Sequence, residues 1–479
     1  MKEKKIEIGI IASILPILLL IILLTINVGI YGDDSLNGSN QFILLVGAFI
    51  AAIIGYFHKV SYKKIINSIS KSVKATTSPI LILLFVGALA GSWLISGIIP
   101  AMIYYGLQIF HPLIFLPACV IICAIISIST GSSWTTSATI GIALIGIGKA
   151  MGINTGIVAG AILSGAYFGD KLSPLSDTTN LAAAMANSNL FNHIRYMTLT
   201  TVPSIVISLL FFILIGFFQV TTEDINNRFL FSSIEEKFFI NPILFVVPVL
   251  VIIMILKKTP PLIALMTGTI LAALFALIFQ QKIVLELTDS NILTLNSAYK
   301  GIIDAITIET TIQSSNEILA ELFKSGGMKG MLGTIWLIIC AMVFGGVMDA
   351  IGALKKISEK LLEKAENTFQ LIFSTSASCI TVNLTASDQY LSIVVPGKMF
   401  QKAYQKRNLA SENLSRTLED SGTVTSVLIP WNTCGAYQSS VLGVSVIDYF
   451  AYAIFNWISP FMTLSYAYFG IKIKKLIDK

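Results

Sequence analysis

Charged residues are scarce in this sequence: Asp, Glu, Lys and Arg make up only 12% of its 479 residues, and the mean hydropathy is +0.81. A soluble domain carries about 25% charged residues. The apolar residues lie in runs of roughly 17–25, which is long enough to cross a hydrocarbon core about 30 Å thick. These values exclude a soluble enzyme, a disordered protein and a nucleic-acid binder. They predict a multi-pass protein of the cell membrane, surrounded by lipid.

Reactive and metal-binding side chains are also few. The five cysteines follow no repeated spacing and the three histidines are scattered, which argues against a disulfide framework or a zinc site. The sequence contains no GxSxG motif, Walker loop or nucleophile–base pair, so we expect no enzymatic activity, no cofactor and no nucleic-acid partner. A transporter without an ATPase domain must use an ion gradient, and a passive channel is the other possibility.

The apolar runs predict an all-α polytopic membrane protein with about ten transmembrane helices. These spans lie near 6–30, 41–57, 79–104, 157–186, 200–220, 239–256, 260–280, 331–352, 420–442 and 446–470. Two further segments, 112–150 and 369–401, are too long for a single crossing, and each carries a small polar stretch at its middle. Each segment is either two crossings or a re-entrant hairpin.

The positions of the lysines favour the hairpins. Lysines and arginines gather in the segments 58–78, 355–364, 402–416 and 472–479, and such segments usually lie in the cytoplasm. All of them can be cytoplasmic only if 112–150 and 369–401 are re-entrant hairpins. The same arrangement places the N-terminus and the C-terminus in the cytoplasm. The stretches 60–75 and 301–324 are amphipathic and are expected to lie along the membrane surface, as arms between a fixed part and a moving part.

The two halves of the chain resemble each other at a nearly constant offset. At 255 residues the matched pairs are Gly91 with Gly346, Gly97 with Gly352, Thr130 with Thr385, Ser132 with Ser387 and Ser137 with Ser392; Asp170 matches Asp420, and Gly47 lies opposite Gly268. Each half, 1–238 and 239–479, then holds five spans and one hairpin. Because five is odd, the second half enters the membrane inverted. Inverted repeats with broken helices are typical of secondary transporters, which bind at the midplane between the repeats.

Polar residues interrupt one predicted span in each half. Residues 164–184 read SGAYFGDKLSPLSDTTNLAAA and residues 418–436 read LEDSGTVTSVLIPWNTCGA. Proline breaks a helix, and unwound backbone is tolerated in a membrane only where protein or a water-filled cavity satisfies it. The two breaks and the two hairpin tips should therefore converge on one cavity. The candidate ion- or substrate-binding residues are Asp177, Asp388, Asp170, Asp420, Thr130, Ser132, Ser133, Ser173, Ser176, Thr178, Thr179, Asn180, Thr385, Ser387, Glu419, Asn432 and Thr433.

This set of side chains offers hard oxygen donors, which suit Na⁺ better than a soft metal. A carboxylate inside the membrane is a functional-site hypothesis by default. Such a group can hold a proton or Na⁺ but not both, so competition combined with alternating access is sufficient for Na⁺/H⁺ exchange. Asp177 and Asp388 are the first candidates for binding Na⁺, because each lies in a polar break or tip. The symmetry of Asp170 and Asp420 suggests a structural part. For each acid, a helix cap or a surface ion pair is the alternative role.

The stretches GSSWTTSATIGIALIGIG, GAYFGDKLSPLSDTTNLAAA and NLSRTLEDSGTVTSVLIPWNTCGA resemble the NhaC family of Na⁺/H⁺ antiporters. The resemblance implies a cell-membrane antiporter with two hairpins, two broken helices, elevator-type motion and a homodimer. The positions it carries over are Asp170, Ser173, Ser176, Asp177, Thr178, Thr179, Asn180, Glu419, Asp420, Asn432 and Thr433.

The first hairpin departs from the family pattern, because residues 131–136 read GSSWTT where the family often has GTSWGT. An extra hydroxyl there would alter selectivity. Similar relatives exchange organic acids, including a malate/lactate type. The alternative function is therefore Na⁺-coupled exchange or symport of a small organic acid or amino acid.

Overall fold

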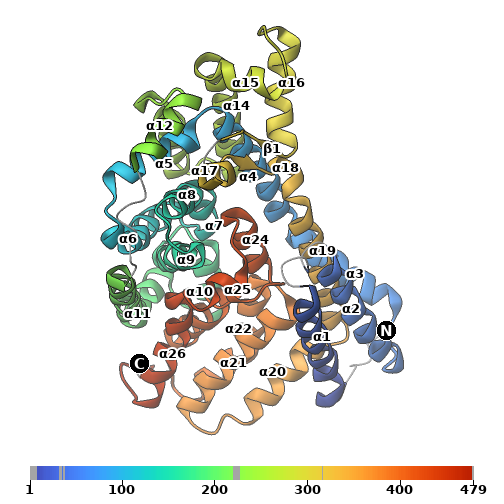
Figure 1. The fold of residues 1–479 in the computed structure, drawn as a ribbon. Helices are drawn as coiled ribbons and strands as arrows, with labels where there is room; N and C mark the ends of the chain where they lie inside the picture. The colour runs from blue at the N-terminus through green and yellow to red at the C-terminus, as the bar shows by residue number, and fades with distance from the viewer. Residues whose placement is uncertain (1–7, 32–34, 36–37, 219–226, 315–316, 477–479) are drawn as a thin grey trace.

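The computed structural model describes residues 8–31, 35, 38–218, 227–314 and 317–476, and most of these residues are helical (Figure 1). Within that part of the chain, one small antiparallel sheet pairs β1 (Thr310–Thr311) with β2 (Lys324–Ser325). The prediction of an all-α polytopic membrane protein is confirmed. Parts of two predicted spans lie outside the described residues: the first residues of the span near 6–30 and the end of the span near 200–220. Asp33 and Asp34, in the loop after the first span, also lie outside them.

Seven of the described helices are long and apolar enough to cross a membrane. They are α1 (Ile10–Tyr31), α2 (Ser39–Phe57), α4 (Thr77–Ile95), α6 (Pro112–Thr130), α11 (Leu190–Phe218), α14 (Pro261–Phe279) and the continuous stretch of α18 (Gly327–Gly330) and α19 (Leu332–Ala350). A bent pair of helices between residues 230 and 256, with 79° between them, gives an eighth span if the pair crosses once. The sequence predicted about ten spans. Three of the predicted spans, near 157–186, 420–442 and 446–470, are interrupted. In addition, α6, which belongs to the predicted hairpin at 112–150, is long and apolar enough to be a span.

The remaining helices are shorter or less apolar. They are α3 (Tyr62–Ala75), α5 (Ile98–Ile109), α7 (Ser133–Thr136), η2 (Ser137–Gly141), α8 (Ile142–Ala150), α9 (Thr155–Leu172), α10 (Asp177–Ala186), α12 (Asn227–Lys237), η3 (Pro242–Phe245), α13 (Val246–Leu256), α15 (Gln281–Leu287), α16 (Leu295–Thr307), α17 (Glu317–Leu322), α20 (Ala353–Glu363), α21 (Thr368–Ala386), α22 (Gln389–Lys406), α23 (Ser411–Leu418), η4 (Glu419–Thr423), η5 (Ser426–Leu428), α24 (Thr433–Leu442), α25 (Val446–Phe450) and α26 (Ile454–Tyr468). The π-helical turns η2 and η4 each lie close to one of the predicted polar motifs.

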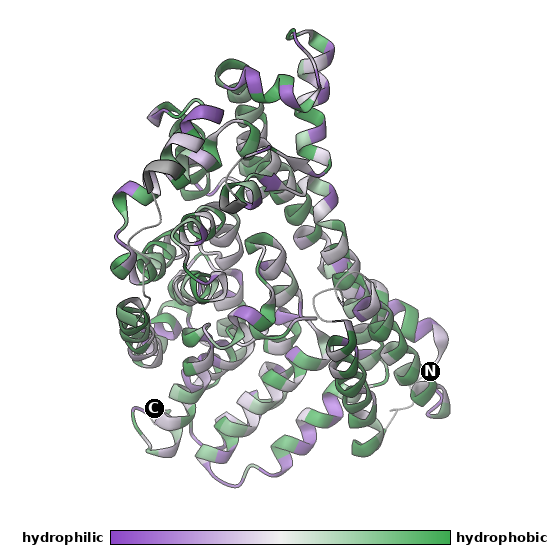
Figure 2. Ribbon diagram, in the orientation of Figure 1, coloured by the Kyte–Doolittle hydropathy of each residue, from purple (hydrophilic) through white to green (hydrophobic). Residues whose placement is uncertain are grey.

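The helices pack around separate apolar cores. One core joins α1, α2 and α19 and contains Leu44 and Phe344. Another joins α6, α9, α11 and α26 and contains Phe115 and Phe212. Trp134 packs against both cores. Figure 2 shows apolar residues in green along α1, α2 and α11, many of them on the outside of the protein. Exposed side chains such as Phe42 are expected to face lipid.

Each long predicted segment folds as helices that meet at a left-handed residue. In the first, α6 ends at Gly131, with φ 70°, and Ser132 caps α7 by accepting from Thr135 N. In the second, α21 ends at Ser387, with φ 56°, and Asp388 caps α22 by accepting from Leu391 N at 2.8 Å. A left-handed residue followed by a capping side chain ends one helix and begins the next. The polar stretches at 129–133 and 385–388 are therefore turns between helices. The re-entrant arrangement of the two hairpins stays a prediction.

Both predicted helix breaks are present. The first separates α9 from α10 at residues 173–176 and contains Pro174, and Ser176 caps α10. The second lies at residues 429–432 between η5 and α24 and contains Pro430. Asn432 caps α24 by accepting from Cys434 N at 3.0 Å. Each proline lacks a backbone N–H donor. Each polar cap accepts a hydrogen bond from a free backbone N–H in the first turn of the helix that follows.

The amphipathic segments lie against spans that are distant in sequence. Helix α16 packs on α4, and α3 packs on α19. Glycines allow both approaches: a Cβ added to Gly91 would lie 1.9 Å from the carbonyl oxygen of Ala305, and one added to Gly346 would lie 2.7 Å from Cα of Ile69. Small residues at such crossings bring helix backbones into contact. An arm from each half of the chain therefore rests on a span of the other half.

We expect Gly91→Ala to destabilise the protein by about 1–3 kcal/mol, because α16 must move away from α4 to make room for the methyl group. Thermal unfolding of the detergent-purified protein measures this effect. Gly333→Ala on α19 is the control, since a Cβ added there meets nothing within 4 Å. Equal melting temperatures for the two variants would contradict the close packing at Gly91.

Candidate functional site

A cavity of about 470 Å³ lies where the first hairpin tip, the α9–α10 break and the start of α22 meet the start of α4. Five residues predicted for the site line it: Thr130, Ser132, Asp170, Asp177 and Thr178. The other residues in its lining are Ala75, Ser78, Pro79, Ile82, Gly131, Trp134, Thr135, Leu175, Pro261, Gln389 and Tyr390. We call this space the carboxylate cavity. It brings the first hairpin tip, the first break and the second hairpin together.

Asp170 is held by the hairpin that follows α6. Its Oδ2 accepts from the backbone N of Ser133 at 3.0 Å and from Ser133 Oγ at 2.7 Å. Its Oδ1 is buried and has no hydrogen-bond partner among the described residues. The residue is 5% exposed. One oxygen of Asp170 is thus fixed by the protein, and the other remains available to a cation or a proton.

Asp177 joins the first break to the second hairpin. Its Oδ1 accepts from the backbone N of Thr178 at 2.9 Å, and its Oδ2 accepts from the hydroxyl of Tyr390 at 2.5 Å. Tyr390 comes two residues after Asp388. The two first candidates for Na⁺ binding therefore belong to segments that are in direct contact. Asp388 itself caps α22 and is not in the lining of the carboxylate cavity.

Asp420 lies in a different, closed network. It forms an ion pair with Lys171, and both side chains are fully buried. Thr200 Oγ1 donates to Asp420 at 2.8 Å, Ser459 Oγ donates at 3.2 Å, and Thr463 Oγ1 donates as well. These donors come from α9, α11 and α26 and satisfy both carboxylate oxygens. The geometry supports a structural part for Asp420, whereas Asp170 faces the cavity.

Glu419 is fully buried, and neither of its carboxylate oxygens has a hydrogen-bond partner among the described residues. It begins the π-helical turn η4. A buried acid without partners is costly when ionised. Both carboxylate oxygens of its neighbour Asp420 accept hydrogen bonds. The two adjacent acids of this motif therefore differ in whether their carboxylates have hydrogen-bond partners. Sequence spacing alone does not distinguish them.

The other predicted residues hold the backbone around the cavity. Ser176 caps α10, Asn180 donates to Ser176 O at 2.6 Å, and Thr179 donates to Lys171 O at 3.1 Å. Ser387 O accepts from Thr433 N at 3.0 Å, and Asn432 donates to Asn383 O at 3.1 Å. The hydroxyls of Ser173 and Thr385 also contact nearby backbone atoms, Leu175 N and Thr381 O.

Among the lining residues that the sequence prediction did not include, two lie at the start of α22: Gln389 and Tyr390. Tyr390 was missed because a tyrosine beside a polar tip has no distinctive pattern, and its partner Asp177 lies 213 residues away. Gln389 was missed for the same reason. Among the described residues, no group of three His, Cys, Asp or Glu side chains could hold a metal ion. A cation in this cavity would therefore be bound by a mixture of carboxylate, hydroxyl, amide and backbone oxygens.

Apolar spans around an open cavity that contains carboxylates define a multi-pass membrane transport protein. Residues 165–471 match the profile described as the Na⁺/H⁺ antiporter family. The chain belongs to this family, and the resemblance found in its motifs is confirmed.

Similar proteins cover nearly the whole chain. The Na⁺/H⁺ antiporter NhaC of Alkalihalophilus pseudofirmus is 37% identical, over 99% of this chain and 98% of its own. A malate-2H⁺/Na⁺-lactate antiporter of Bacillus subtilis is 36% identical, over 90% of this chain and 88% of its own. The NhaC antiporter of the same organism is 35% identical, over 84% of this chain and 86% of its own.

We expect Tyr390→Phe to lower the apparent KM for Na⁺ by about tenfold, because a hydrogen bond to a charged group contributes roughly 1.5 kcal/mol or more, and a bound cation must displace it. Sodium-dependent exchange in proteoliposomes measures this value. Tyr404→Phe is the matched control: Tyr404 is on the same helix and its hydroxyl meets Thr375 Oγ1 at 3.1 Å, away from the cavity. Identical KM values in the two variants would show that the Tyr390 hydroxyl does not compete with Na⁺.

Lys171→Met should lower the stability by about 3–5 kcal/mol, because it leaves the buried Asp420 carboxylate without its cation. The double variant Lys171→Met with Asp420→Leu should recover part of this loss, since no unpaired charge remains. Thermal unfolding in detergent compares the variants. Lys149→Met provides the control, because the Lys149–Glu321 pair is exposed to solvent. A single Lys171 variant as stable as the parent protein would refute the structural role of the pair.

Proposed function

We propose that this chain exports Na⁺ across the cell membrane in exchange for protons, by alternating access. The observation that carries the proposal is the carboxylate cavity, in which Asp170 and Asp177 lie among hydroxyl groups. Membership of the Na⁺/H⁺ antiporter family supports the same function.

Competition at a carboxylate explains how the exchange is coupled. Asp170 Oδ1 has no partner among the described residues, and Asp177 Oδ2 is held only by the hydroxyl of Tyr390. Either acid can be neutralised by a proton or can bind Na⁺ together with oxygens of Thr130, Ser132 or Thr178. Asp388 and Glu419 stay candidates for a proton that moves during the cycle. One occupant excludes the other, so transport of Na⁺ one way drives protons the other way.

An inverted repeat of residues 1–238 and 239–479 is the second part of the proposal. Left-handed turns occur at Gly131 and Ser387, close to the same offset. The crossed arms, α16 on α4 and α3 on α19, are what a two-fold relation between the halves requires. Broken helices at 173–176 and 429–432 add a third pair of related features. Elevator-type motion of the hairpins and broken helices would then move the carboxylate cavity across the membrane.

The membrane topology is a prediction that rests on charge. The lysine-rich segments 58–78, 355–364, 402–416 and 472–479 place the hairpin at 369–401 on the cytoplasmic side and the hairpin at 112–150 on the opposite side. Both termini are then cytoplasmic. The homodimer that the family resemblance implies also stays a prediction.

The size of the cavity favours a second candidate. About 470 Å³ is far larger than a dehydrated Na⁺ requires, and it can hold a small carboxylate beside the ion. One relative is named as a malate-2H⁺/Na⁺-lactate antiporter. Na⁺-coupled exchange or symport of a small organic acid or amino acid is therefore the alternative. Uptake of labelled malate, lactate and amino acids into the same proteoliposomes separates it from ion exchange alone.

In proteoliposomes, an imposed Na⁺ gradient should move protons, and Asp177→Asn should reduce this movement to the level of empty liposomes. The amide cannot be ionised, so it loses both the proton and the charge that attracts Na⁺. A pH-sensitive dye inside the vesicles measures the exchange. Asp289→Asn, after α15, is the control, because Asp289 is exposed and lines neither this cavity nor the other described ones. Unchanged exchange in the Asp177 variant would remove this residue from the site.

A further inference from the structure

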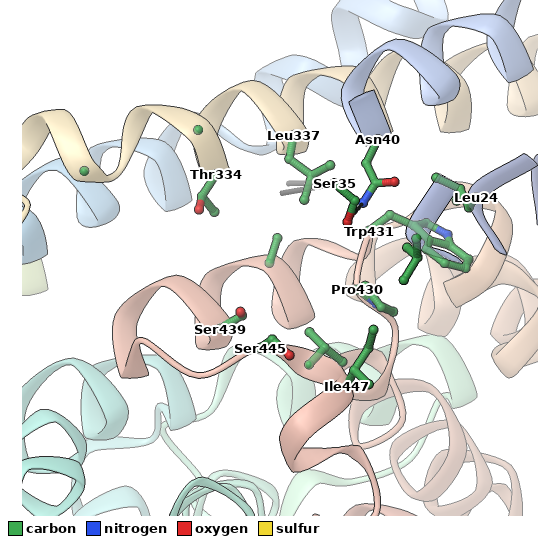
Figure 3. Close-up of a pocket in the computed structure, with 15 residues that line it drawn as sticks. Leu24, Ser35, Asn40, Thr334, Leu337, Pro430, Trp431, Ser439, Ser445 and Ile447 are labelled. Carbon is green, nitrogen blue, oxygen red and sulfur yellow. Dashed lines mark hydrogen bonds between the residues drawn. The ribbon is translucent and has the colours of Figure 1, made fainter. Parts of the chain in front are cut away.

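A second cavity, of about 220 Å³, lies between α1, α2 and α19 on one side and the second helix break with α24 and α25 on the other (Figure 3). We call it the outer cavity. Ser35, Asn40, Thr334, Ser439 and Ser445 supply its polar side chains. Apolar residues such as Leu24 and Leu337 cover much of the remaining wall.

The two cavities are lined by equivalent positions of the two halves. The offset of 255 residues that relates Gly91 to Gly346 also carries lining residues of the carboxylate cavity onto lining residues of the outer cavity. The pairs are Ala75 with Gly330, Ser78 with Gly333, Pro79 with Thr334, Ile82 with Leu337 and Leu175 with Pro430. The offset that relates Gly47 to Gly268 also relates Asn40 to Pro261, and these residues again line opposite cavities.

The predicted inversion of the halves places the cavities on opposite faces of the membrane. Ala75 and Ser78 lie at the end of the lysine-rich segment 58–78, so the carboxylate cavity is predicted to be on the cytoplasmic side. The N-terminus and the segment 58–78 are both predicted to be cytoplasmic, so the loop between α1 and α2 is predicted to be external. Ser35 lies in this loop, and Asn40 lies in the first turn of α2. The outer cavity thus occupies, on the external face, the place that the carboxylate cavity occupies on the internal face.

A stacked aromatic pair joins the wall of the carboxylate cavity to α24, a helix of the outer cavity. Trp134, which lines the carboxylate cavity, stacks on Tyr437 with 4.0 Å between ring centroids and 17° between ring planes. The Tyr437 hydroxyl donates to Trp134 O at 3.2 Å. Tyr437 follows Ala436 of the outer cavity on α24, and Trp431 stands in the wall of that cavity, with its Nε1 donating to Leu384 O at 2.9 Å. The stacked pair connects the first hairpin to the helix after the second break.

We propose that the outer cavity is the closed external half of the ion pathway, and that the stacked pair Trp134–Tyr437, supported by Trp431, is the barrier between it and the carboxylate cavity. The inference rests on the proposed function. The proposed ligand of the outer cavity is a hydrated alkali cation. Hydroxyl and amide oxygens in its wall can bind this cation. Among the described residues that line the outer cavity none is charged, whereas the carboxylate cavity contains Asp170 and Asp177. The outer cavity therefore lets the cation pass without retaining it.

Thiol labelling in oriented membrane vesicles tests the assignment of the two faces. Ser78→Cys marks the carboxylate cavity, Ser445→Cys marks the outer cavity, and the five native cysteines are all buried. We expect a membrane-impermeant maleimide to label Ser78→Cys only from the cytoplasmic side and Ser445→Cys only from the external side. Labelling of both variants from one side would overturn the proposal.

The barrier is tested with Ser132→Cys, at the first hairpin tip. In the parent background, we expect labelling of this cysteine from the cytoplasmic side only. Adding Tyr437→Ala should raise its labelling rate from the external side by about tenfold, the contribution of one stacked aromatic pair. Tyr437→Phe keeps the ring and should leave the rate unchanged. Trp134→Leu removes the other ring of the stack and serves as the second variant, should Tyr437→Ala fail to fold. No increase in either ring-removal variant would overturn the barrier.

Labelling in buffer without Na⁺ requires no transport, so its outcome is independent of the exchange assay. If Na⁺/H⁺ exchange occurs and the labelling pattern differs from that expected, only the assignment of the outer cavity fails. If the labelling is as expected and no exchange occurs, only the transported ion is wrong.

Discussion

A charged or polar group inside a membrane must find its partner within the protein, because no bulk water is present there. The Lys171–Asp420 pair meets this requirement at full burial, and Thr200, Ser459 and Thr463 complete its hydrogen bonds. The network fastens α9, α11, η4 and α26 to one another. Because Asp170 is the residue before Lys171, the same anchor fixes where the first carboxylate of the cavity lies. The ion pair thus helps to fix the geometry of the carboxylate cavity.

Helix interruptions were predictable because their causes are local. Pro174 and Pro430 lack a backbone donor, and the polar residues beside them are those that cap a following helix. The turns at Gly131 and Ser387 were visible as small polar stretches inside apolar segments. Hydropathy also identified the long spans. It overestimated their number, since a run that is apolar on average can contain a break that divides it into short helices.

Side-chain partners were less predictable because they depend on tertiary contacts. Asp170 and Asp420 look equivalent in the repeat, yet one faces a cavity and the other is enclosed by donors. Asp388 has the sequence context of a free acid at a tip, and its carboxylate accepts from the backbone of α22. Lys171 and its partner are 249 residues apart, and no local pattern connects them. The sequence therefore predicted the residue types around the candidate site better than it predicted their hydrogen-bond and ion-pair partners.

Contacts between the halves also govern how the protein can move. Helix α16 is pressed on Gly91 of α4, and α3 is pressed on Gly346 of α19, with no room for a methyl group at either point. Each arm is therefore held by the opposite half. If the hairpins and broken helices move as proposed, both contacts would have to shift together, which would link opening at one membrane face to closing at the other.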